Sequence, residues 1–90
     1  MNIDDLKVDC KIKINNKIYD VISIQPDANR TEKGEYEFFW AIYLHVLGDK
    51  HLSPTHTLDY YSEQKIVKFV SILEDVPTKI INPEFIELIN

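Results

Sequence analysis

A strict alternation of apolar and polar residues runs from Val8 to Ile14, where every second side chain is apolar and those between are charged. Such a period of two is typical of a half-buried strand. The next two residues, Asn15 and Asn16, tolerate the positive φ angles of a two-residue turn. The pattern therefore predicts a hairpin that continues into a second strand from Lys17 to Ile24.

This hairpin has two conceivable registers. A two-residue turn places Tyr19 and Val21 on the buried face and sets Lys11 opposite Asp20 as an ion pair. A three-residue turn buries the isoleucines of the second strand and brings Asp20 into the core. We favour the two-residue turn, which requires other parts of the chain to cover the side chains of Ile18, Ile22 and Ile24.

The segment from Gln25 to Glu35 is polar and contains both Pro26 and Gly34. This composition predicts a loop of about ten residues, which is longer than most hairpin connections. A mobile loop tip and a functional loop both fit such a segment.

The most apolar stretch, Glu35 to Leu47, predicts a long strand whose two faces differ. One face is apolar throughout, and we expect it to be core; it carries Tyr36, Phe38, Trp40, Ile42, Leu44 and Val46. The other face is mixed in polarity, and either the protein's own chain or a partner covers it, since Tyr and Phe beside isolated charges are common at interfaces. This second face carries Glu37, Phe39, Ala41, Tyr43, His45 and Leu47.

The second half of the chain has a less regular pattern. Pro54 disfavours a central strand, so the next predicted strand is a short one from Leu58 to Tyr61. Thereafter apolar residues recur at helical spacing, which predicts a helix from Glu63 to Glu74 with Ser62 as its cap. The helical positions are Ile66, Phe69, Val70 and Leu73. A strand from Lys65 to Leu73 is the alternative, because Val67 and Ile72 are also apolar and β-branched.

At the C-terminus, Asn82 is a good helix cap and Pro83 suits a first helical position. These residues predict a short helix from Pro83 to Ile89, and a closing strand is the alternative. The order of hairpin, long loop, aromatic strand, turn and "YYSEQKIVKF" resembles that of small SH3-like barrels, an architecture without a function-specific motif.

The fold class expected for this single domain of residues 1–90 is α+β, with a small curved antiparallel sheet, SH3-like or half-barrel, covered by one C-terminal helix. The alternative is an all-β SH3-like barrel.

The composition narrows the function classes. Hydrophobic residues make up 44% and charged residues 28% of the chain, the balance of a soluble globular domain. The net charge is −5 and Arg30 is the single arginine, which argues against direct nucleic-acid binding. No apolar run is long enough for a membrane helix, and the N-terminus does not resemble a signal peptide. We expect a cytoplasmic protein that does not bind membranes.

Catalytic and metal-binding motifs are weak. Two glycines cannot form a phosphate-binding loop, and the one cysteine, Cys10, lies on the predicted buried face, where its thiolate is disfavoured. The histidines at 45, 51 and 56 show no recurrent metal-ligand spacing. We therefore expect no enzyme activity, cofactor or metal.

The sequence favours a non-enzymatic protein-binding module, whose partner has a basic surface. A small phage or mobile-element inhibitor of a host nucleic-acid-handling or defence protein fits this size and charge. The predicted partner-binding residues are the acidic group about the long loop and the polar-apolar side of the aromatic strand: Asp27, Glu32, Glu35, Glu37, Phe39, Tyr43 and His45. The alternatives are a structural homodimer and a small metal-dependent enzyme using His51, His56 and Asp59.

Overall fold

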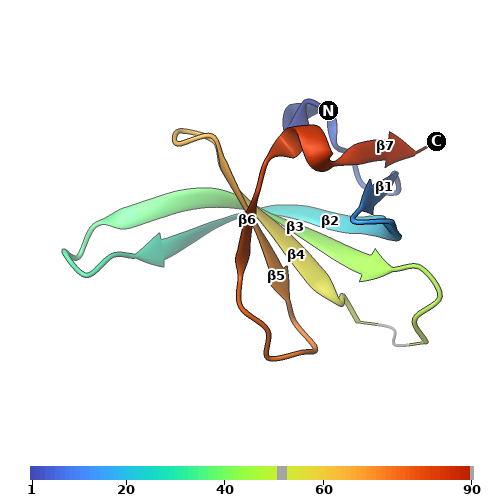
Figure 1. Ribbon diagram of the computed structural model, residues 1–90. Helices are drawn as coiled ribbons and strands as arrows, with labels where there is room; N and C mark the ends of the chain where they lie inside the picture. The colour runs from blue at the N-terminus through green and yellow to red at the C-terminus, as the bar shows by residue number, and fades with distance from the viewer. Residues whose placement is uncertain (51–52, 90) are drawn as a thin grey trace.

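The computed structural model describes residues 1–50 and 53–89, and these form one antiparallel sheet with two short 3-10 turns. The sheet order is β6-β5-β4-β3-β2-β1-β7. Two 3-10 turns, η1 (Ile3–Asp5) and η2 (Pro83–Phe85), lie at the same end of the molecule (Figure 1). The strands are β1 (Lys11–Ile14), β2 (Lys17–Arg30), β3 (Tyr36–Val46), β4 (His56–Tyr61), β5 (Ile66–Ser71), β6 (Lys79–Ile81) and β7 (Glu87–Ile89).

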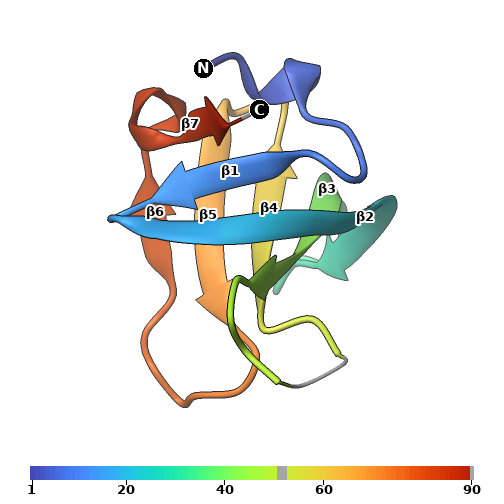
Figure 2. The ribbon, with the colours of Figure 1, turned by 90° about the vertical axis from the view of Figure 1, so that its right-hand side faces the viewer.

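The sheet curls into a half-barrel. Figure 2 shows β1 and β2 crossing in front of β4, β5 and β6 at a steep angle, so that the inner faces of the two halves cover each other. The outermost strands, β6 and β7, are consecutive in the chain and are joined through η2. The expected α+β class with a C-terminal helix is therefore wrong, and the all-β alternative fits.

The predicted helix from Glu63 to Glu74 is instead the turn and strand β5, which pairs with β4 from His56↔Ser71 to Tyr61↔Ile66. In this conformation Val67 is fully buried, whereas Leu73, a member of the helical stripe, is 50% exposed. The spacing of apolar residues in this segment fits both a helix and a strand. Only a strand, however, supplies backbone hydrogen bonds to the edge of β4 that does not pair with β3.

The C-terminal segment combines parts of both alternatives. The Asn82 side chain caps η2 by accepting a hydrogen bond from the Glu84 amide, with Pro83 in the first turn. The turn ends after three residues, however, and the predicted helix to Ile89 does not form. Residues Glu87–Ile89 pair with β1 instead, and the intervening Ile86 is 1% exposed in the core.

The first hairpin has the predicted two-residue turn. Asn15 and Asn16 have φ angles of 51° and 66°, as a primed turn requires. Tyr19 lies opposite Ile12, and the Lys11 ammonium pairs with the Asp20 carboxylate. The strand begins later than the alternation predicts, at Lys11, and the expected core residue Val8 is 48% exposed.

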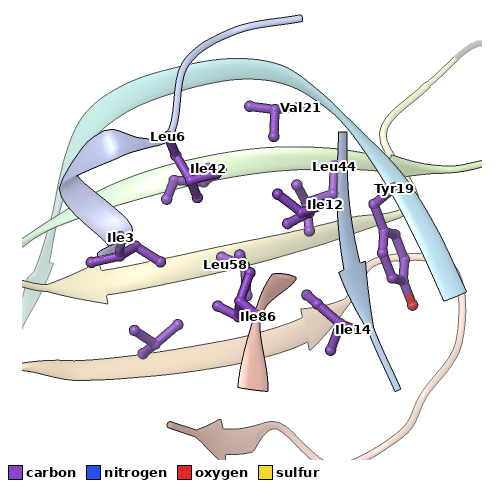
Figure 3. Packing of buried hydrophobic residues seen from close by; sticks show 11 residues of the cluster. Ile3, Leu6, Ile12, Ile14, Tyr19, Val21, Ile42, Leu44, Leu58 and Ile86 are labelled. Atoms are coloured by element: carbon purple, nitrogen blue, oxygen red, sulfur yellow. The ribbon is translucent and has the colours of Figure 1, made fainter. Parts of the chain in front are cut away.

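The core lies between the two halves of the curled sheet (Figure 3). Side chains from β1, β2, β3 and β4 meet there, and Ile3 and Leu6 from the N-terminal segment cover one end. A bulge in β2 between Val21 and Ser23 shifts the alternation by one residue. As a result Ile24 packs against the core, whereas Ile22 is 39% exposed.

Across the two described ranges, no helix has the length and apolar character needed to cross a membrane.

Candidate functional site

The distal parts of β2 and β3 form a two-stranded ribbon, residues 25–40, that projects from the half-barrel on the left of Figure 1. It projects because its neighbours are shorter. The β1–β2 pairing reaches only to Lys11↔Asp20, and β4 pairs with β3 no further out than Trp40↔Tyr60. The molecule is accordingly elongated, with principal extents of 41 × 27 × 20 Å.

The ribbon replaces most of the loop predicted from Gln25 to Glu35. Residues 25–30 pair with β3, and only the turn from Thr31 to Glu35 connects the strands. This turn is closed by the Thr31 amide, which donates to the Glu35 carbonyl at 2.7 Å. Pro26 is tolerated opposite Trp40 because this part of β2 has a strand on only one side, so the missing N–H interrupts no second ladder.

One face of the ribbon is an exposed aromatic strip, defined as Tyr36, Phe38 and Trp40. Their exposed fractions are 62%, 74% and 45%. The expectation that these three residues lie in the core is wrong. They share a strand face with the buried Ile42 and Leu44. Trp40 lies at the limit of the part of that face that the rest of the half-barrel covers, and Tyr36 and Phe38 lie beyond it.

The opposite face of the ribbon is held against the sheet by a second, smaller hydrophobic cluster. The Phe39 ring stacks on Tyr61 with centroids 4.9 Å apart, and Phe39 is 8% exposed. The Asn29 side-chain amide donates to the Tyr61 hydroxyl at 3.0 Å, and the Lys68 ammonium lies 4.7 Å from the centre of the Tyr61 ring. These contacts fix the base of the ribbon, so the aromatic strip is carried on an ordered support.

Burial, together with the nearby Asp59 carboxylate, raises the pKa of Tyr61. Burial also raises the pKa of Asp59 itself, and a hydrogen bond with Thr57 opposes that effect. Both residues lie on the side of the sheet that carries Phe39, which is the less hydrated side of the ribbon base.

The structure distributes the seven predicted partner-binding residues over the ribbon and the sheet. Alternation in β3 places Phe39, Tyr43 and His45 on one face, as the sequence predicts, and the last two are half-buried. Asp27 is paired opposite Phe39 and therefore lies on this same face, and Glu37 belongs to it as well. Glu32 and Glu35 lie in the exposed turn at the tip.

Alternation alone predicted the aromatic strip as core and not as a surface. A signal was present: the cross-strand neighbours of the strip come from a polar segment, residues 25–30, which offers little apolar surface to cover it. Each residue of the strip faces one of these neighbours across the ribbon, in the pairs Trp40↔Pro26, Phe38↔Ala28 and Tyr36↔Arg30.

The residues considered for a metal site are not brought together. His56 and Asp59 are three positions apart in β4 and so lie on opposite faces of the sheet, and His51 lies outside the described residues. His56 packs instead among aromatic rings, with its Nδ1 atom 2.8 Å from the Thr55 hydroxyl. Within the described ranges, no group of three potential ligands is close enough to hold a metal ion.

No protein-family description, curated protein or solved structure matches this chain.

Proposed function

We propose that this protein is a non-enzymatic protein-binding module that contacts its partner through the aromatic strip of the β2–β3 ribbon. The observation that carries the proposal is the exposure of Tyr36, Phe38 and Trp40 in consecutive positions of one strand face. Apolar side chains exposed singly are ordinary, but a contiguous row of large rings on a projecting element is typical of an interaction surface.

The composition and support of the strip also suit binding. Trp and Tyr are the residues that most often dominate interface energetics. Tyr36 and Phe38 already lie close together, with ring centroids 6.5 Å apart. Because Phe39 and Tyr61 hold the reverse side of the ribbon, little conformational freedom is lost when a partner docks, which favours affinity.

The charges on the ribbon indicate the character of the partner. The ribbon bears four carboxylates and two cations between Gln25 and Trp40, and the whole chain has a net charge of −5. Two of the carboxylates, Glu32 and Glu35, are exposed in the tip turn at the end of the aromatic strip. The partner surface that complements this arrangement is an apolar groove with a basic rim, and such complementarity speeds association.

The test is capture of a partner from lysate of the source cells by the immobilised chain, followed by affinity measurement with the purified captured protein. Phe38→Ser should reduce the affinity at least tenfold, about 1.4 kcal/mol. Phe85→Ser is a matched control, because Phe85 is 72% exposed and Phe38 is 74% exposed, but Phe85 lies on η2, outside the ribbon.

Equal loss of affinity in both variants would contradict the proposal, because an exposed phenylalanine outside the ribbon would then matter as much for binding as one on the aromatic strip. Light scattering of the purified chain measures its oligomeric state. A concentration-dependent dimer that Phe38→Ser abolishes would replace the protein partner with a second copy of this chain.

A further inference from the structure

A cavity of about 260 Å³ lies at the base of the ribbon, where the N-terminal segment meets the sheet. Trp40 and Tyr60 flank it from β3 and β4, where they are directly paired across the strands and so share one face. The Asp4 side chain of η1 contributes to the lining. The remaining lining residues are aliphatic: Ile3, Leu6, Ile24 and Ile42.

The polar part of this cavity is anionic. Asp4 is exposed, and it lines the cavity together with Tyr60. Burial and the Asp4 carboxylate together raise the pKa of Tyr60, so the hydroxyl remains a donor. The Asn2 side chain accepts a hydrogen bond from the Asp4 backbone amide, which holds η1 in place. The carboxylate is thus positioned at a cavity whose other lining residues are aromatic or aliphatic.

An arginine side chain matches these features in three respects. Its methylenes can lie along the aliphatic residues, as long cationic side chains commonly do. Its planar guanidinium can stack on an aromatic ring, and Trp is the best such ring for a cation. Its N–H groups can donate to the Asp4 carboxylate.

The size of the cavity suits a single long side chain. Its volume of about 260 Å³ lies at the lower end of the range of pockets that bind small molecules, which is roughly 300–1,000 Å³. The cavity adjoins the aromatic strip, because Trp40 belongs to both. A protein lying along the strip can therefore place a side chain in the cavity.

We propose that this cavity receives an arginine side chain of the partner protein, held by Trp40, Tyr60 and Asp4. This inference rests on the proposed function, and it names the partner chemistry that the base of the ribbon recognises.

The test uses the isolated chain and a minimal probe, N-acetylarginine methylamide. Trp40 is the only tryptophan, so its indole N–H gives a single, site-specific NMR signal. We expect that signal to shift in a saturable manner with a dissociation constant on the order of millimolar, since a single side chain offers limited binding energy. The citrulline analogue, which has the same shape and no charge, should give no saturable shift.

Asp4→Asn should weaken binding of the arginine probe at least fivefold. The matched control is Asp5→Asn, which removes the neighbouring η1 carboxylate that does not line the cavity. Equal binding of the arginine and citrulline probes, no saturable shift with arginine, or equal loss of affinity in both variants would overturn the arginine site.

These outcomes are separable from failure of the proposed function. If capture of a partner depends on Phe38 but the arginine probe does not bind, the cavity proposal fails, and the proposed role of the aromatic strip in partner binding is retained. If the probe binds with the expected dependence on Asp4 but no captured protein depends on Phe38, the proposed function fails and so does the assignment of the arginine to its partner.

Discussion

The imidazole of His56 stacks on the Phe69 ring, with centroids 5.1 Å apart and planes inclined by 8°. Tyr19 meets the His56 ring edge-on from the opposite half of the curled sheet, at a centroid distance of 5.1 Å. These contacts link β2, β4 and β5 at the end of the half-barrel away from η1. A titratable group is thereby built into the packing between the two halves.

Stability should therefore fall in mild acid through His56. Burial, and then the charge of Lys17, lowers the pKa of His56 from 6.5. Because the folded pKa is below the unfolded value, the stabilising contribution is present above about pH 6.5 and is lost as the pH falls through the folded pKa. In thermal unfolding followed by circular dichroism, His56→Phe should lose less stability than the wild type between about pH 7.5 and about pH 5.

His56→Phe preserves a ring against Phe69, so the comparison isolates the titration from the packing. Parallel pH profiles for the two proteins would show that His56 titrates alike in the folded and unfolded chains, contrary to this expectation.

Ile86 and Phe85 should differ sharply in their contribution to stability, although they are adjacent. Ile86 is 1% exposed and Phe85 is 72% exposed. Ile86→Val should lower the free energy of unfolding by about 0.5–1.5 kcal/mol and Ile86→Ala by about 2–5 kcal/mol. Phe85→Ala should change it by less than about 0.5 kcal/mol. Urea denaturation measures all three, and a neutral Ile86→Ala would show that the C-terminal segment does not close the core.

The first hairpin should depend on the turn at Asn15 and Asn16. Asn16 has a φ angle of 66°, which asparagine tolerates but β-branched residues avoid. Asn16→Val should cost about 1–2 kcal/mol of folding free energy, the usual penalty of the left-handed region. Asn16→Gly is the control and should retain or slightly increase stability, because glycine fits the second position of this turn. Chemical denaturation that ranked valine above glycine would rule out the primed turn.

The candidate site was only partly predictable because its exposure depends on distant strands. Alternation correctly assigned Phe38 and Leu44 to one face of β3, but Leu44 is 0% exposed and Phe38 is 74% exposed. Nothing in their local sequence separates them. The difference arises because β4 and the N-terminal segment extend along β3 only as far as Trp40.

The cavity at Trp40 and Tyr60 was beyond prediction for a similar reason. It combines β3, β4 and η1, and only the β3–β4 register brings these two rings together. The Asp4 carboxylate reaches them because the chain folds back over the open end of the core.

By itself, the sequence determined those features that neighbouring residues control. Two asparagines favour the primed turn, that turn sets the register of Lys11 with Asp20, and the period of two makes residues 36–46 a strand. Only the tertiary structure decided which apolar positions are covered, and whether residues 66–71 become a helix or a strand. The physical reason is that burial and ladder pairing are supplied by residues far away in the chain, so the same local pattern is compatible with core, surface, helix and strand.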